Sequence, residues 1–140
     1  MLDPIAALRE MVRVCVPGGC IVVVDAYASE DPAKAAAFNQ LERLRDPSHA
    51  CSLSLTELKS LFVRVGLPEP RVNLYELRVE VQELLARAFS NPGDHAKIVE
   101  TFKASAADDR LGIPVCLDGD KIHITYRAAI LVANRSAWPQ

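Results

Sequence analysis

Hydrophobic positions in the first part of the chain change from helical to strand spacing across a proline-glycine turn. Asp3-Pro4 is typical of a helix start, because the aspartate can cap free amides and proline tolerates the first turn. The apolar positions that follow share one helical face: Ile5, Leu8, Val12 and Cys15. Pro17-Gly18-Gly19 should end this helix. Residues 21–24 are then all apolar, which is typical of a parallel strand covered on both faces.

Two further helices are indicated by their caps. Asp31-Pro32 should open a helix that ends before Asp46-Pro47, because the residue before proline avoids the helical region. Ser54 and Glu57 form a capping box, so we expect a third helix over residues 55–65.

The second half of the chain mixes strand and helix patterns. Residues 71–79 look extended, but their alternation changes phase near Leu74-Tyr75, which indicates a bulge or a twisted edge strand. A helical pattern returns from Val81 and includes Phe89, and another helix is expected over 94–107. The turn at 118–120 predicts a hairpin between 115–117 and 121–124, and the apolar run 128–133 predicts a last strand. The predicted fold class is α/β.

Composition narrows the class of protein. The chain has 140 residues, half of them hydrophobic, which suits one domain with a core. Its formal net charge is −2 with charges of mixed sign, so nucleic acid is not expected as a partner. It has no apolar run of about 18 residues and no secretory signal pattern. We therefore expect a cytoplasmic protein that does not bind membranes.

The four cysteines do not form a C-x-x-C pair, and since three of them lie in apolar segments they are expected to be reduced core thiols. His49-Ala50-Cys51 could supply half of a metal site, but no matching second half is present in the sequence. No metal site is predicted.

Three stretches carry a family resemblance. The first is residues 8–14 with Pro17-Gly18-Gly19 and the strand to Asp25, the second is residues 39–49, and the third runs from Asp118-Gly119 to 130–135. Together they resemble class I S-adenosylmethionine-dependent methyltransferases, in particular the ubiquinone/menaquinone-biosynthesis type. The resemblance implies a single partial methyltransferase domain over 1–140. It would hold strands five, seven and six of a Rossmann-like, doubly wound sheet, with strand seven antiparallel in the middle.

The resemblance also implies S-adenosylmethionine as cofactor, but the motif that binds it is missing. None of the six glycines forms the G-x-G turn after a strand that the family uses, so no cofactor-binding residue is assigned. The chain would then be truncated relative to the family and carry only the acceptor side. The strand over 20–26 should keep one unpaired edge, so we expect a homodimer, a larger homo-oligomer or a complementary N-terminal half as partner.

The polar cluster Arg45-Asp46-Pro47-Ser48-His49 is the candidate site. His49 is the candidate catalytic base, since imidazole titrates near neutrality. Tyr27, Arg45, Asp46 and Ser48 are the candidate substrate-binding residues, with Arg45 pairing either with Asp46 or with an acidic substrate. The structural alternative is a helix end with a proline stop, and Asn39 is expected to face solvent.

Two functions remain open. The first is methyl transfer to a small molecule, with this chain as the acceptor-side half. The second is a catalytically inactive remnant that serves as a dimerisation or binding module. A third interpretation is an open reading frame that begins further upstream.

Overall fold

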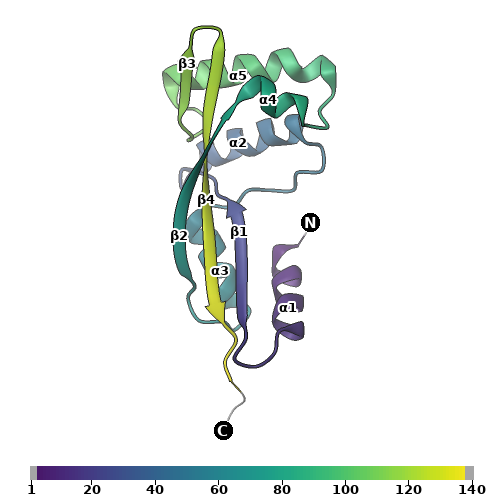
Figure 1. The fold of residues 1–140 in the computed structure, drawn as a ribbon, viewed down its shortest axis with the longest axis vertical. Coiled ribbons are helices and arrows are strands. Elements are labelled where there is room, and N and C mark those ends of the chain that lie inside the picture. The colour runs from purple at the N-terminus through teal and green to yellow at the C-terminus, as the bar shows by residue number, and fades with distance from the viewer. Residues whose placement is uncertain (1–2, 138–140) are drawn as a thin grey trace.

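A computed structural model describes residues 3–137, which form five α-helices, one 3-10 turn and a four-stranded sheet (Figure 1). The elements in chain order are α1 (Pro4–Val14), β1 (Cys20–Ala26), α2 (Pro32–Arg45), α3 (Leu55–Arg64), β2 (Arg71–Glu80), α4 (Val81–Ala86), the 3-10 turn η1 (Pro92–Asp94), α5 (His95–Asp108), β3 (Val115–Asp118) and β4 (Lys121–Asn134).

The predicted caps explain where the first three helices begin. The Asp3 carboxylate accepts hydrogen bonds from two free amides of α1, and Asp31 does the same for α2. Both halves of the Ser54–Glu57 capping box are formed at α3. These local predictions are confirmed.

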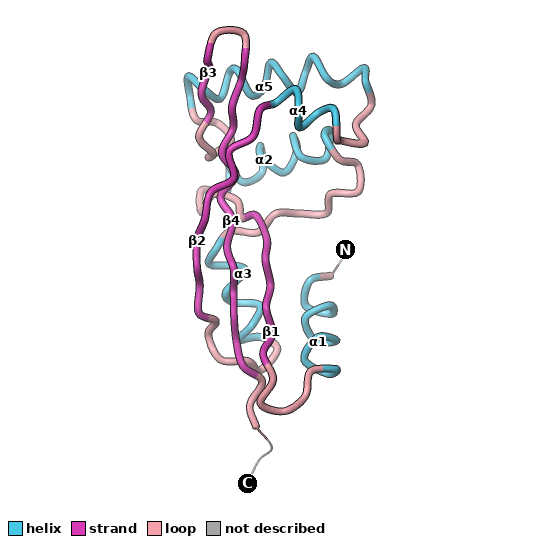
Figure 2. The backbone as a smooth tube through the Cα atoms, viewed as in Figure 1, coloured by secondary structure: helices cyan, strands magenta, loops and turns pink. Residues whose placement is uncertain are grey.

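The long strand β4 organises the sheet. It lies between β1 and β2 (Figure 2), and β3 pairs with its first residues. Because β4 is antiparallel to both β1 and β2, these two strands run parallel to each other. The sequence predicted two separate strands, 121–124 and 128–133, whereas the structure joins them into one. Within residues 3–137, β1 is an edge strand, as expected.

Two hydrophobic clusters cover opposite faces of this sheet. The upper cluster packs α2, α4 and α5 on one face, around Phe38, Phe102 and Ile124. The lower cluster packs α1 and α3 on the other face, around Phe62 and Leu131. The core therefore crosses from one face to the other along β4, where the adjacent residues Ala128 and Ala129 are both buried.

Of the two alternatives for the phase change near Leu74, the bulge is wrong, whereas β2 does lie at an edge of the described sheet. The pairing of β2 with β4 runs without interruption from Arg71–Val132 to Glu80–His123. Val72 belongs to the lower cluster and Val79 to the upper one, so the apolar alternation changes phase because the covering layer changes face.

Three other expectations are wrong. The cysteines are not core thiols, since Cys20, Cys51 and Cys116 are exposed and Cys15 is only partly buried. The strand β1 is covered on one face only, with Val22 and Val24 47% and 56% exposed, because no described element packs on that face beside them. The helix predicted from Val81 ends at Ala86, and Phe89 is 90% exposed rather than part of an apolar face.

Candidate functional site

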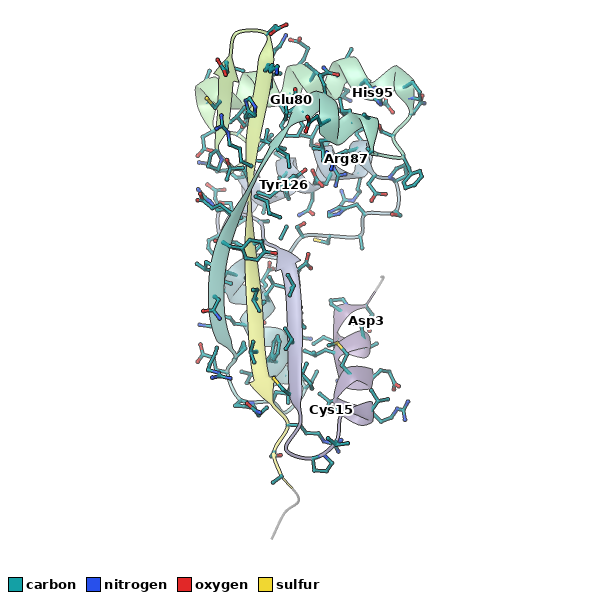
Figure 3. All side chains as sticks on the ribbon, viewed as in Figure 1. Asp3, Cys15, Glu80, Arg87, His95 and Tyr126 are labelled. Carbon is teal, nitrogen blue, oxygen red and sulfur yellow. The ribbon has the colours of Figure 1, made fainter. Side chains whose placement is uncertain are left out.

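A hollow of about 370 Å³ opens at the carboxyl end of β1, beneath α2. Its floor is the sheet and its rim is the loop that follows α2. Figure 3 shows Tyr126 on β4 at the level of α2. The lining residues are Val24, Asp25, Ala26, Phe38, Glu42, Arg45, His49, Ser52, Tyr75, Leu77, Tyr126 and Ala128.

Asn39 connects α2 to the loop that carries His49. Its side chain is buried, 5% exposed, which corrects the expectation that it faces solvent. Its Nδ2 donates to the carbonyl oxygens of Ala35 and Ser52, each at 3.0 Å. Its Oδ1 accepts from the Ser52 amide at 2.6 Å and lies 2.9 Å from His49 Nε2. Asn39 is buried because the loop turns back over this face of α2.

Glu42 is the most deeply buried charge of the hollow, 3% exposed. Its carboxylate accepts hydrogen bonds from Arg45, at 2.5 Å to Nη2, and from the Tyr126 hydroxyl at 2.9 Å. Arg45 therefore uses its guanidinium on Glu42, one turn earlier in α2, and not on Asp46. This pair neutralises itself inside the hollow.

Aromatic and aliphatic side chains form the rest of the wall. Phe38 and Tyr126 contact edge to face, with ring centroids 6.1 Å apart. Tyr75 and Leu77 of β2 lie on the same sheet face as Tyr126, because paired residues of antiparallel strands share a face. The hollow thus combines apolar side chains with several polar and charged groups, an arrangement that can orient a small molecule.

The electrostatic environment shifts three ionisable groups. Burial raises the pKa of the Tyr126 hydroxyl, and the negative charge of Glu42 adds to the effect. Burial alone would lower the pKa of Arg45, but the hydrogen bond and charge of Glu42 outweigh it and raise that pKa. Partial desolvation raises the pKa of Asp25, opposed by the Ala26 amide and by the charge of His49.

The structure brings two of the five predicted site residues, Arg45 and His49, to the hollow. Asp46 accepts hydrogen bonds from the backbone and hydroxyl of Ser48, so this pair shapes the turn before His49, and these bonds lower the pKa of Asp46. Tyr27 packs with the lower cluster on the other face. Their contact with a substrate stays a prediction.

Sequence reasoning missed Glu42 and Tyr126. The Glu42–Arg45 spacing of three residues on a helix was a usable signal for an ion pair. Tyr126 lies 84 residues from Glu42, and only the pairing of β4 with its neighbours brings it near.

A second hollow, of about 270 Å³ and mostly apolar, lies between α1, β1 and α3. Figure 1 shows α1 on the side of β1 away from β4, where the strand has no partner within residues 3–137. Asp25 and Cys51 are among its few polar groups. The lining residues are Pro4, Ala7, Leu8, Met11, Val23, Asp25, Ala50, Cys51, Leu53, Leu58, Leu61 and Phe62.

Two features of the described part of the chain bear on other classes of function. Residues 3–137 contain no cluster of three or more histidine, cysteine or acidic side chains placed to hold a metal ion. Among the same residues, no helix has the length and apolarity needed to cross a bilayer.

The known proteins that this chain is similar to are methyltransferases. No family model matches the chain. YcgJ of Bacillus subtilis, described as an uncharacterised methyltransferase, is 31% identical over 128 residues, or 89% of this chain and 50% of YcgJ. The crystal structure of YcgJ superposes with a TM-score of 0.85 at 26% identity, covering 96% of this chain and 58% of YcgJ.

A second solved structure supports the fold alone. It is a candidate methyltransferase of Bacillus halodurans, with a TM-score of 0.87 at 15% identity, covering 98% of this chain and 65% of that protein. The chain spans about half the length of the curated relative it matches. Sequence and fold together support a methyltransferase-like protein.

Proposed function

We propose that this chain is the acceptor-binding half of a class I methyltransferase that uses S-adenosylmethionine to methylate a small molecule. The observation that carries the proposal is the hollow under α2, which holds His49 among apolar walls in a chain similar to methyltransferases. Its volume of about 370 Å³ suits a small acceptor.

The cofactor itself has no evident cradle in the described residues. A glycine-rich turn between a strand and a helix would normally receive it. The loop from β1 to α2 contains no glycine, and β2 passes directly into α4. Residues 3–137 therefore do not fit S-adenosylmethionine by themselves, and the chain's own contribution is to bind and orient the acceptor and to take its proton.

The charges of the hollow favour a neutral acceptor. Arg45 is engaged by Glu42, so its positive charge is not available to a substrate anion. The remaining carboxylate, Asp25, would repel an anion. A neutral molecule with an aromatic or aliphatic body and a hydroxyl near His49 fits these walls better than the acidic substrate considered for Arg45.

The missing cofactor side is proposed to come from a partner. The edge of β1, the exposed side chains of Val22 and Val24, and the apolar hollow beside α1 are surfaces that would pack against further structure. The partner is a segment outside this sequence, a separate polypeptide, or a second copy of the chain. The same surfaces favour the alternative function, an inactive dimerisation or binding module.

Titration calorimetry separates these proposals. S-adenosylmethionine and its demethylated product are titrated into the chain alone, and then into the chain mixed with the part of YcgJ that it does not match. Binding only in the mixture supports the acceptor-half proposal. Micromolar binding by the chain alone means that a pocket is rebuilt between copies. Absence of binding in a mixture shown by light scattering to be a complex favours the inactive module.

The acceptor site is tested in the form that binds S-adenosylmethionine in the titration, whether that is the chain alone or the mixture. Leu77→Trp narrows the hollow and should slow methyl transfer to a panel of phenols and other neutral alcohols. Leu74→Trp is the matched control, since Leu74 is similarly exposed on the same strand but faces the other side of the sheet. Equal rates in both variants would show that the acceptor binds elsewhere.

A further inference from the structure

The hydrogen bonds of Asn39 fix which way its amide points. The backbone amide of Ser52 needs an acceptor, and it lies 2.6 Å from Oδ1. The carbonyl oxygens of Ala35 and Ser52 need a donor, and both lie 3.0 Å from Nδ2. A reversed amide would place two donors together at the Ser52 amide and two acceptors together at both carbonyls, so one orientation satisfies all three backbone groups.

That orientation determines the protonation of His49. The ring nitrogen Nε2 lies 2.9 Å from Asn39 Oδ1, an atom that only accepts hydrogen bonds. Nε2 must therefore carry a hydrogen. Since a neutral imidazole has a single N–H, the lone pair is left on Nδ1. Among residues 3–137, the ring of His49 has its one hydrogen bond through Nε2.

We infer that Asn39 is a positioning residue that holds His49 as the Nε2–H tautomer, so that Nδ1 is the atom that takes the proton from the acceptor hydroxyl. The base role rests on the proposed function, whereas the tautomer does not. In the step, the acceptor O–H bond breaks, its proton forms a bond to Nδ1, and the electron pair stays on the acceptor oxygen. The resulting imidazolium keeps Nε2–H on Asn39.

The surrounding groups suit that charge change. Asp25 at the end of β1 and Asp46 in the turn before His49 both attract a positive imidazole. Burial raises the pKa of Asp25, and the charge of His49 opposes that rise. The bonds from Ser48 lower the pKa of Asp46, and the charge of His49 adds to that effect. The Glu42–Arg45 pair on α2 adds no net charge, and Tyr126 on β4 is neutral. Asn39 also fixes the ring in space, because its two bonds to Ser52 hold the loop against α2.

Nitrogen NMR of the wild-type chain tests the tautomer without any activity. With labelled histidine at about pH 8, above the usual imidazole range, the Nε2–H form of His49 should exceed the Nδ1–H form by on the order of tenfold. Its hydrogen should exchange slowly enough to be observed. A dominant Nδ1–H form would overturn the inference.

Substitutions test the positioning role of Asn39 in the form that binds S-adenosylmethionine, whether that is the chain alone or the mixture. Asn39→Ala should lose the slow Nε2 hydrogen and lower kcat on the order of tenfold or more with KM nearly unchanged. Asn39→Asp keeps an acceptor oxygen for Nε2 and should retain the Nε2–H signal, although its second oxygen faces the carbonyl oxygens of Ala35 and Ser52 and should lower stability. Asn73→Ala, an exposed asparagine on β2, is the control and should change neither.

Two results distinguish failure of the positioning role of Asn39 from failure of the proposed function. An unchanged kcat in folded Asn39→Ala would overturn the positioning role. Wild-type protein that shows the Nε2–H form and binds cofactor, yet transfers no methyl group, would overturn the proposed function and leave the tautomer assignment standing.

Discussion

Removing the charge of Glu42 should cost far more stability than removing a similar charge at the surface. The variant Glu42→Gln leaves the Arg45 guanidinium, whose side chain is 19% exposed, without its counter-ion in a largely buried position. Loss of one partner of a buried pair typically costs about 3–5 kcal/mol. Because Arg45 keeps some contact with water, we expect the lower end, about 3 kcal/mol.

The structure offers a matched control for this variant. Glu100 pairs with Lys103 at the same three-residue spacing, but the two side chains are 72% and 48% exposed. A solvated pair of this kind contributes roughly 0–1 kcal/mol. Glu100→Gln should therefore change the free energy of unfolding by less than about 1 kcal/mol.

Two further variants show how much of the stability lost in Glu42→Gln comes from the hydrogen bond of Tyr126 and how much from the unpaired charge of Arg45. Tyr126→Phe removes one hydrogen bond to a charged carboxylate and should cost about 1.5–3 kcal/mol. The double variant Glu42→Leu/Arg45→Leu removes both charges together. It should be more stable than Glu42→Gln alone, because no charge is left uncompensated.

Urea denaturation monitored by circular dichroism measures these differences in the free energy of unfolding. All variants are compared at one protein concentration, so that any self-association affects them equally. A loss of about 3 kcal/mol would lower Tm by roughly 10 °C. If Glu42→Gln costs no more than Glu100→Gln, Arg45 does not depend on Glu42, and the argument that its charge is unavailable to a substrate fails.

Three other outcomes follow from the structure. Above about pH 10, a rise in pH should destabilise the wild type more than Tyr126→Phe. The raised pKa of Tyr126 keeps this hydroxyl protonated in the folded state, while the unfolded chain loses the proton. Urea midpoints at pH 9 and 11 measure the difference, and equal losses of stability in the two proteins would contradict the prediction. Gly112→Ala should destabilise more than Gly66→Ala, since both have positive φ but only a Cβ at Gly112 would meet Ser29, at 2.7 Å; equal urea midpoints would refute the clash. Val22→Lys should weaken self-association in light scattering if the open face of β1 is an interface, whereas Arg64→Gln should not.

The candidate site was only partly predictable. Residues 45–49 stood out because charged and ring side chains gather at a proline stop, and His49 and Arg45 do line the hollow. The partners that give them their chemistry were not evident. Asn39 looked like a solvent-facing helix residue because its partner Ser52 lies beyond the turn, and the place of Tyr126 depends on strand pairing.

The local structure could be predicted from the sequence, because caps, proline stops and glycine turns act within a few residues. Asp3, Asp31 and the Ser54–Glu57 box set the starts of three helices in this way. Which sheet face each apolar residue covers depends instead on the packing of the whole fold. The single strand β4 and the phase change in β2 come from helices packing on opposite faces of one sheet, and burial on a face depends on elements distant in sequence.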